Sequence, residues 1–366
     1  MITLQKEPFL QAIKVVKTSV GKASLQPNLS AIHIKSENGG LTLTGTDINT
    51  SARAIVEANV TEPIDICVNA EKLDLIISRL EDIIILDIQD AMLIIKSGRA
   101  KFELLTINSN EYPHPKFEIN DNPIVLGCDS FTSGINKTIF STMQTDSQIL
   151  NGVCLTLDGE NGFEFASTDG NRLSQVKFNI PIKEQGQYAI PRKILTDIIK
   201  NNIKNEVKLY INENKTRITF ELDNCIFSSA LFTGNYPKYQ QLIPQNLSKE
   251  VVINKNALLH ALETVAIMVD DRTNIASFSF TKENLELSSK ITDKGNAKDV
   301  LELIKSKGID TFNIAFNYKY LIECLKVFNN NVENVVIKMQ NSNSACIING
   351  EGEENYLYLI MPCQVR

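Results

Sequence analysis

Three stretches of the sequence decide the fold: Gly40-Leu-Thr-Leu-Thr44, Gly162-Phe-Glu-Phe-Ala166 and Asn284-Leu-Glu-Leu-Ser288. They stand 122 residues apart, and 122 is one third of the 366-residue chain. Each alternates apolar and polar side chains, the period-two pattern of a strand that is buried on one face. A repeat of this length exceeds a solenoid unit, which spans about 20–50 residues. The sequence therefore predicts three tandem copies of one domain.

Other markers recur with nearly the same spacing. Two Thr-Asp pairs, Thr46-Asp47 and Thr168-Asp169, stand 122 residues apart. Near the end of each third, proline follows a tyrosine or methionine: Tyr112-Pro113, Tyr236-Pro237 and Met361-Pro362. We expect domains over residues 1–120, 121–246 and 247–366. Linkers are expected near residues 112–122 and 242–250, where proline, asparagine and other polar residues cluster.

Each third also contains two expected helices. The first of each pair is predicted at residues 7–20, 128–142 and 254–268, and the second at 69–80, 191–204 and 317–328. In the second set, apolar residues recur at three- and four-residue steps, which is the pattern of a helix with one buried face. Short strand-like runs lie between the helices, such as Ile83–Ile88, Met92–Lys96 and Val207–Ile211. The predicted fold class is α+β, dominated by antiparallel strands.

Composition excludes several classes of protein. With 43% apolar and 22% charged residues, the chain can bury a large core. No apolar run reaches the ~18 residues of a membrane-spanning helix, and the first residues lack the pattern of a signal peptide. The seven cysteines are scattered, and the closest two are 17 residues apart, which argues against a zinc knuckle or a disulfide framework. We expect a cytosolic protein with reduced thiols and no membrane partner.

A search for catalytic motifs finds none. The sequence contains no phosphate loop, dinucleotide-binding fingerprint, nucleophile elbow or zinc-binding His-Glu-x-x-His helix. The acidic pairs Asp270-Asp271 and Glu353-Glu354 lie in polar, turn-like surroundings and are interpreted as solvated charges. His33 alternates with isoleucines and is interpreted as structural. We therefore predict no catalytic residue, no metal site and no cofactor.

Charge is unevenly distributed. The net charge of −6 by itself argues against a nucleic-acid partner. The six predicted helices, however, carry twelve Lys and Arg against seven Asp and Glu, a net charge of +5. The rest of the chain carries 25 basic and 36 acidic residues, a net charge of −11. This pattern fits a protein that presents one surface to a polyanion, although lysine is also a common helix former on any solvated face.

Three segments resemble signatures of the bacterial DNA polymerase III beta subunit family, the sliding clamps: Thr168-Asp-Gly-Asn-Arg-Leu173, Tyr236-Pro-Lys-Tyr-Gln-Gln-Leu-Ile-Pro244 and Tyr358-Leu-Ile-Met-Pro362. The resemblance covers the whole chain. It implies three clamp domains, each with two helices backed by two antiparallel sheets. It also implies a head-to-tail homodimer, a six-domain ring that encircles duplex DNA without sequence specificity. Such a protein is a non-catalytic processivity factor of the bacterial cytoplasm, associated with the nucleoid during replication.

The resemblance and the basic helices together indicate which residues face DNA. These are Lys14, Lys17, Lys22, Lys72, Lys137, Arg192, Lys193, Lys200, Lys204 and Lys255. Glu71 stands where some family members have a DNA-contacting arginine, so Lys72 or Lys22 is expected to substitute for it.

The resemblance also implies a partner pocket between the second and third domains. Its matching positions are Leu150, Thr168, Gly170, Asn171, Arg172, Leu173, Pro237, Gln241, Leu242, Leu359, Met361, Pro362 and Cys363. The implied ligand is a short motif rich in Gln, Leu and Phe, carried by the DNA polymerase III catalytic subunit, the clamp loader, other polymerases and repair proteins. Asn171 replaces a common histidine and Gln241 a common arginine, so the peptide preference is expected to differ. Taken without the resemblance, the same residues read as an ordinary turn and core leucines.

A dimer seam is the last implied surface. Its expected members are Arg99, Lys101, Phe102 and Leu104 in the first domain, with Ile267 and Met268 as apolar partners in the third. Two other hypotheses remain open from the sequence. One is an open repeat-domain adaptor that binds proteins and never encloses DNA, and the other is an α+β enzyme.

Overall fold

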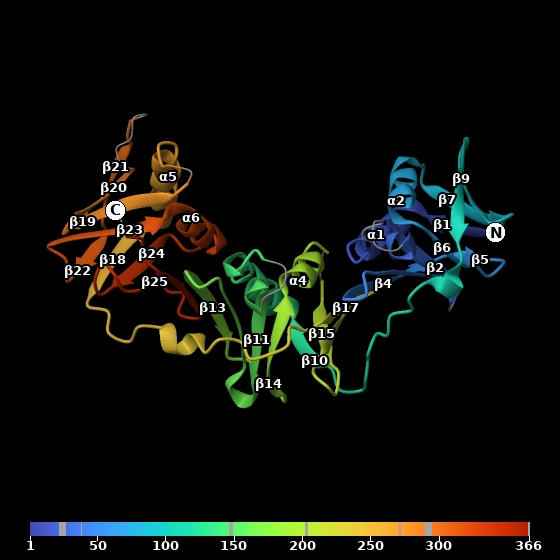
Figure 1. Cartoon of the computed structure of the whole chain (residues 1–366), viewed down its shortest axis with the longest axis horizontal. Coiled ribbons are helices and arrows are strands. Elements are labelled where there is room, and N and C mark those ends of the chain that lie inside the picture. The colour runs from blue at the N-terminus through green and yellow to red at the C-terminus, as the bar shows by residue number, and fades with distance from the viewer. Residues whose placement is uncertain are drawn as a thin grey trace. The chain divides into compact units, whose positions relative to one another are not determined.

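The computed structural model describes residues 1–21, 27–37, 39–145, 149–201, 204–270, 272–289 and 295–364 (Figure 1). Within these ranges the α-helices are α1 (Lys6–Lys17), α2 (Ala70–Arg79), α3 (Cys128–Asn136), α4 (Arg192–Ile199), α5 (Lys255–Ala266) and α6 (Tyr318–Val327). Each lies within a few residues of an expected helix. The structure thus confirms the two-helix pattern of each repeat.

Asparagine caps explain where three of the helices begin. Asn69, Asn254 and Asn317 each accept a hydrogen bond from a backbone N–H of the first helical turn, at 2.9, 3.0 and 3.0 Å. A side-chain oxygen at this position satisfies an N–H that otherwise has no partner in the helix. Two expected helices end early. Helix α3 stops at Asn136 and is followed by a 3₁₀ turn over Ile139–Ser141, and α4 stops at Ile199.

The chain divides into two compact units. The first comprises residues 1–131 and 193–232, and the second comprises residues 132–192 and 233–366. The division passes through the middle repeat because its strands belong to two different sheets. The repeat boundaries at 120 and 246 stay predictions.

The first unit contains one continuous antiparallel sheet. Its strand order, within the described residues, is β10 (Ile124–Gly127), β15 (Glu206–Ile211), β16 (Arg217–Leu222), β17 (Cys225–Ala230), β4 (Thr50–Glu57), β3 (Gly40–Thr46), β2 (Ala31–Glu37), β6 (Asp65–Asn69), β9 (Ala100–Ile107), β8 (Met92–Ser97), β7 (Ile83–Gln89), β1 (Ile2–Gln5) and β5 (Asn59–Val60). The predicted strands at residues 83–88, 92–96 and 207–211 are β7, β8 and β15. Strand β17 of the middle repeat pairs with β4 of the first, so one sheet joins two repeats.

Alternation along β2, β3 and β4 separates a helix-facing side from an outer side. Helices α1 and α2 pack side by side, and α1 covers β3 and β4 (Figure 1). Gly45 lies under the end of α1, where a Cβ atom would come within 2.2 Å of the Val16 carbonyl oxygen. Only glycine permits this approach. The opposite side of the sheet therefore carries the polar residues of the alternation, among them His33, Thr44 and Arg53.

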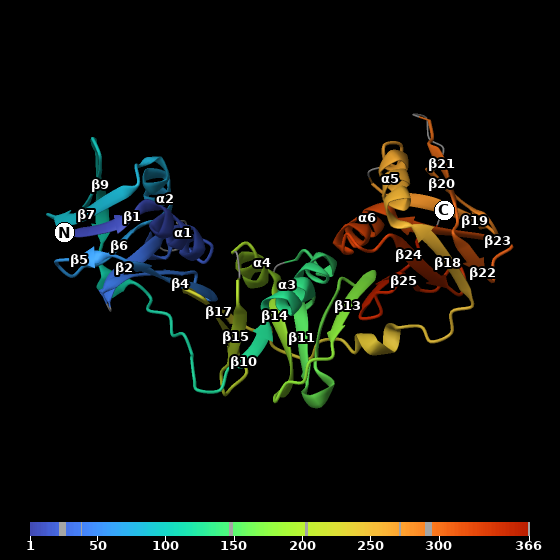
Figure 2. The same ribbon diagram turned by 180° about the vertical axis from the view of Figure 1, so that it is seen from behind.

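The second unit contains two antiparallel sheets. The larger has the order β14 (Gln185–Pro191), β11 (Gly152–Asp158), β12 (Phe163–Thr168), β13 (Arg172–Phe178), β26 (Tyr356–Ile360), β25 (Cys346–Gly350), β24 (Asn334–Met339), β18 (Lys249–Asn254) and β22 (Lys305–Lys307). The smaller has the order β21 (Lys298–Glu302), β20 (Asn284–Ser289), β19 (Ile275–Thr281) and β23 (Thr311–Asn317). Helices α5 and α6 pack together, and α5 also packs on β20 and β21 (Figure 2). Strand β26, near the end of the chain, pairs with β13 of the middle repeat.

Candidate functional site

The turn between β12 and β13 is the centre of the predicted partner pocket. The Thr168 hydroxyl accepts a hydrogen bond from the Gly170 N–H (3.1 Å) and donates one to the Arg172 carbonyl (2.6 Å). Asp169 Oδ1 accepts from the backbone N–H groups of Asn171 (2.9 Å) and Arg172 (3.1 Å). Gly170 adopts a φ of 91°, a conformation that glycine reaches without strain. The Thr-Asp pair thus fixes the turn, and the glycine completes it.

The Arg172 side chain stabilises this turn. Its Nε donates to Asp169 Oδ2 (3.0 Å), its Nη2 to the Phe140 carbonyl (2.7 Å) and its Nη1 to Glu323 on α6. The guanidinium also lies 4.1 Å from the centre of the Tyr320 ring. Burial by itself lowers the pKa of Arg172, but Tyr358 and the carboxylates of Glu323 and Asp169 raise it above its usual value. The sequence did not reveal Glu323 or Tyr320 as members of the site, because nothing local links α6 to a turn about 150 residues earlier.

The end of the chain meets the same turn. Leu173 and Leu359 lie opposite each other in the β13–β26 pair, and the Met361 N–H donates to the Asn171 carbonyl (2.9 Å). The Tyr236 hydroxyl accepts from the Thr168 N–H (3.2 Å) and donates to the Gly152 carbonyl (3.3 Å). Burial raises the pKa of Tyr236, so the phenol stays protonated. Segments near residues 152, 168, 236 and 361 therefore converge within the second unit.

Burial separates the predicted pocket residues into a support and a surface. Four are buried, namely Thr168, Arg172, Leu173 and Leu359. Three are half-buried, namely Leu150, Pro362 and Cys363. The other six are exposed: Gly170, Asn171, Pro237, Gln241, Leu242 and Met361. The buried four support the turn and the strand pair around it, and the assignment of all these residues to a partner pocket stays a prediction. Leu242 (59% exposed) and Met361 (41%) are the large apolar side chains that remain open to solvent.

The residues predicted to face DNA also differ in burial. Lys14, Lys72, Lys193, Lys200 and Lys204 are exposed, Lys17 and Arg192 are half-buried, and Lys22 lies outside the described residues. Lys137 is 3% exposed, forms an ion pair with Glu353 and lies over the Tyr356 ring. Lys255 is 6% exposed and donates to the Asn329 carbonyl (3.0 Å). Because their ammonium groups are internal, the prediction that Lys137 and Lys255 face DNA is wrong for this structure.

Three of the remaining basic residues have acidic neighbours: Lys17, Lys193 and Lys200, the last with its Nζ 3.6 Å from Asp197 Oδ1. Lys17 Nζ lies 2.6 Å from Asp74 and 2.8 Å from Glu71, so Glu71, which stands where some family members have a DNA-contacting arginine, offsets the charge of Lys17. Lys193 Nζ lies 3.4 Å from Asp47 Oδ2, and it also donates to the Thr18 carbonyl (2.9 Å) and to the Thr50 hydroxyl (3.0 Å). The basic surface of the described helices is therefore smaller than the sequence count indicated.

The predicted seam residues lie on exposed strand and helix ends. Strand β9 pairs with β8 over residues 100–105, whereas β6 reaches it only at residues 106 and 107. Phe102 (38% exposed) and Leu105 (66%) project from this stretch, and Arg99 and Lys101 are exposed. In the second unit Ile267 is 80% exposed. Leu104 and Met268 are half-buried.

The structure adds apolar residues to this set that the sequence did not single out. Strand β21 lies at the edge of its sheet and carries Val300 (52% exposed), and Ile304 (58% exposed) follows it. Leu105 was predictable in principle from the alternation along β9. An exposed edge strand that carries apolar side chains is a typical site for strand pairing.

No cluster of three or more His, Cys, Asp or Glu side chains in the described ranges is arranged to hold a metal ion. Likewise, no helix in the described part of the chain has the length and hydrophobicity to cross a membrane.

Comparison with family models accounts for nearly the whole chain. Residues 1–116 match the DNA polymerase III beta subunit N-terminal domain, residues 126–238 its central domain, and residues 240–364 its C-terminal domain. The curated beta sliding clamp of Bacillus subtilis is 26% identical, with 98% of both chains covered. That of Synechococcus elongatus is 28% identical, with 97% of this chain and 96% of that protein covered.

Solved structures give the same result for the fold. The crystal structure of a DNA polymerase sliding clamp from Bacillus subtilis matches with a TM-score of 0.91 and 25% identity, covering 100% of this chain and 99% of that one. A sliding clamp from Pseudomonas aeruginosa, crystallised with griselimycin bound, matches in fold with a TM-score of 0.92 at 24% identity, over 99% of both chains.

These matches define a protein of the DNA sliding clamp class, built from three tandem clamp domains. The prediction of an α+β clamp fold is thereby confirmed. The chain belongs to the DNA polymerase III beta subunit family.

Proposed function

We propose that two copies of this chain join head to tail into a closed ring that encircles duplex DNA and slides along it without sequence specificity. The observation that carries the proposal is that all three repeats match clamp domains, end to end. A head-to-tail contact gives a ring only when the rotation between subunits closes. Retention on DNA then comes from topology and needs no chemistry, so the ring acts as a non-catalytic processivity factor.

Exposed lysines supply the attraction for DNA. Lys14 on α1, Lys72 on α2, Lys200 and Lys204 are exposed, and they carry the proposed contacts with phosphates. Such contacts are independent of sequence and are screened by salt. Because base-edge contacts would hold a protein at one site, phosphate contacts alone suit a ring that slides.

The seam joins β9 of one copy with β21 of the other. Both are edge stretches with exposed apolar side chains, Phe102 and Leu105 on one and Val300 on the other. Ile267 and Met268 contribute further apolar surface. Backbone pairing and apolar burial stabilise this contact more than exposed ion pairs, which contribute about 0–1 kcal/mol each.

Polymerases, the clamp loader and repair proteins dock in the second unit, at the turn that follows Thr168. Leu242 and Met361 offer apolar surface, while Asn171 and Gln241 offer amide groups at its rim. A short peptide rich in Gln, Leu and Phe complements that combination. The bound griselimycin in the Pseudomonas aeruginosa structure supports the view that clamps of this fold accept ligands.

Retention on circular DNA tests the proposal. The clamp is loaded onto nicked circular DNA with a clamp loader, and the DNA is then either left circular or cut once. We expect clamps to stay on the circle at a salt concentration that abolishes direct binding and to leave the cut DNA by its ends. Equal loss from both substrates, or a monomeric mass by analytical ultracentrifugation, would favour the open adaptor over the ring.

A charge-reversed variant separates attraction from topology. Lys200→Glu with Lys204→Glu should weaken association with DNA while the dimer mass stays unchanged, because both side chains are exposed. Dissociation into monomers would instead place these lysines at the seam.

A further inference from the structure

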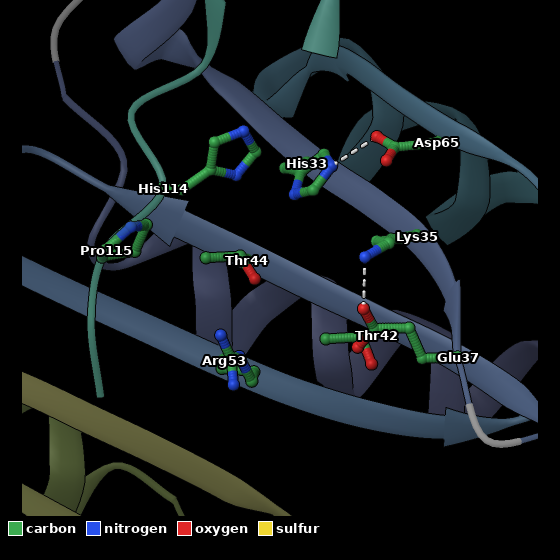
Figure 3. A pocket seen from close by; sticks show the side chains of 9 residues that line it. All are labelled: His33, Lys35, Glu37, Thr42, Thr44, Arg53, Asp65, His114 and Pro115. Atoms are coloured by element: carbon green, nitrogen blue, oxygen red, sulfur yellow. Dashed lines mark hydrogen bonds and ion pairs between the residues drawn. The ribbon is translucent and has the colours of Figure 1, made fainter. Parts of the chain in front are cut away.

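A polar cavity lies on the outer side of the first repeat, away from α1 and α2. It has a volume of about 130 Å³ and is bounded by β2, β3, β4 and the segment that follows Tyr112 (Figure 3). Its floor carries Thr42 and Thr44 of β3, and Arg53 of β4 lies beside them (Figure 3). His114 and Pro115 cover it from the other side. The proposed ring and partner site do not use this cavity.

Most charges around the cavity are already paired. His33 Nε2 lies 2.7 Å from Asp65 Oδ1, and Lys35 Nζ lies 2.6 Å from Glu37 Oε1, as the dashed lines in Figure 3 mark. Arg53 differs. Its Nε is buried and has no hydrogen-bond partner within the described part of the chain.

Arg53 is partly buried, so the missing hydrogen-bond partner of its Nε destabilises the folded state. Its guanidinium lies 4.4 Å from the centre of the Phe117 ring, and burial lowers the pKa of Arg53. Glu37 opposes this effect through its charge, but its carboxylate is the partner of Lys35. A buried donor without an acceptor loses its hydration without compensation. Arg53, which lines the cavity, therefore carries one unsatisfied cationic donor.

In the other two repeats, the polar side chain at the position equivalent to Arg53 has an acceptor. Arg53 lies opposite Thr44 in its strand pair, Gln175 opposite Ala166, and Lys298 opposite Ser288, so the three occupy one register. Gln175 Nε2 donates to Glu164 Oε2 (2.8 Å), and Lys298 Nζ lies 2.6 Å from Glu286 Oε2. In both repeats, therefore, a glutamate on the neighbouring strand accepts from the donor at this register.

The first repeat lacks that glutamate. Thr42 stands 122 residues before Glu164 and, at the same spacing again, before Glu286. The residue that packs beside this position also differs between the first and second repeats. In the second repeat the buried Tyr239 donates its hydroxyl to Glu164, whereas Pro115 holds the equivalent place after the Tyr112-Pro113 pair. The first repeat thus lacks both the carboxylate and the ring, and the cavity remains.

We propose that this cavity binds the carboxylate of a small organic acid, which takes the place of the missing glutamate side chain beside Arg53. A planar carboxylate matches the fork of a guanidinium. The Thr44 hydroxyl and His114, which also line the cavity, supply further polar contacts. Glu37 and Asp65 disfavour a dianion through repulsion, so the site selects a monocarboxylate over phosphate.

Thermal unfolding of the full-length protein tests this site, with acetate as the probe and chloride at equal ionic strength as the reference. We expect acetate well above its dissociation constant to raise the midpoint by about 2 °C or more, because a ligand that binds only the folded state stabilises it. Phosphate should raise it less. A phosphate effect larger than that of acetate would overturn the assignment of the ligand.

Two variants copy the other repeats. Arg53→Gln reproduces Gln175, and it should abolish the response to acetate while the protein remains folded. Thr42→Glu reproduces Glu164, and it should raise the midpoint in chloride and remove the response to acetate. An Arg53→Gln protein that responds like the wild type, or a Thr42→Glu protein that is less stable and still responds, would refute the site.

A direct measurement covers the case in which a variant fails to fold. The Nε–Hε signal of Arg53 in an NMR spectrum of the wild-type protein should shift on titration with acetate and saturate. A signal that does not move at any acetate concentration would overturn the proposal irrespective of the variants.

Discussion

Two turns of this molecule are built alike and used differently. In the first unit, the turn Thr46–Thr50 precedes β4, and in the second unit the turn Thr168–Arg172 precedes β13. The Ile48 N–H donates to Thr46 Oγ1 (3.0 Å), as the Gly170 N–H does to Thr168 Oγ1 (3.1 Å). The Ala230 N–H donates to the Asn49 carbonyl (2.9 Å), the counterpart of the bond from Met361 to Asn171.

The side chains around these two turns differ in burial, in contacts and in backbone conformation. The Arg172 side chain is buried and makes ionic and aromatic contacts, whereas the hydroxyl of its counterpart Thr50 accepts a hydrogen bond from Lys193. Ile48 adopts a φ of 79°, where the second turn has Gly170. The repeated Thr-Asp pair therefore specifies the backbone, while the residues around it decide whether a turn becomes a supported binding surface.

The largest expected effect is the removal of Arg172. Arg172→Ala removes the ionic partner of the half-buried Asp169, and we expect a loss of about 3 kcal/mol in the free energy of unfolding, the lower end for a broken buried ion pair because Glu323 is half exposed. The urea midpoint measures this loss. Lys193→Ala is the matched change at the first turn and should cost less than about 1 kcal/mol, since that lysine is exposed. Equal losses would mean that the two turns are supported alike.

The next effect concerns the binding surface. Leu242→Ala with Met361→Ala should weaken a Gln-Leu-Phe-type peptide at least about tenfold, because both side chains are exposed apolar anchors. Calorimetry gives the affinity. Ile48→Ala removes a comparably exposed side chain (59%) from the first turn and should leave the affinity unchanged. A loss that follows Ile48 would move the docking site to the first unit.

The smallest effect is expected from exchanging the residue types at the two left-handed positions, Ile48 and Gly170. A left-handed conformation costs a residue with a Cβ atom about 1–2 kcal/mol. Ile48→Gly should therefore stabilise the protein by about 1 kcal/mol, after the larger entropy of unfolded glycine is subtracted. Gly170→Ile should destabilise it by at least a similar amount, although a Cβ atom there meets nothing within 4 Å. Unfolding midpoints that shift in the same direction would contradict this account.

The sequence by itself determined the repeat, the fold class and most of the helices. Strand alternation is a local signal, so Gly40–Thr44 and its two counterparts predicted strands. The caps made by Asn69, Asn254 and Asn317 are also local, because each asparagine bonds to its own first helical turn. The Thr168–Leu173 segment likewise carried its own turn geometry within six residues. These features need only neighbours along the chain.

Only the tertiary structure decided which side chains are available. Lys137 and Lys255 read as surface lysines, yet contacts with Glu353 and Asn329, more than 70 residues away, bury them. Arg172 read as a polar anchor, but Glu323 and Tyr320 of α6 enclose it. The sequence analysis did not single out Arg53, and the missing partner of its Nε shows only beside the paired Gln175 and Lys298. Burial and pairing depend on residues distant in the sequence, and folding alone brings them together.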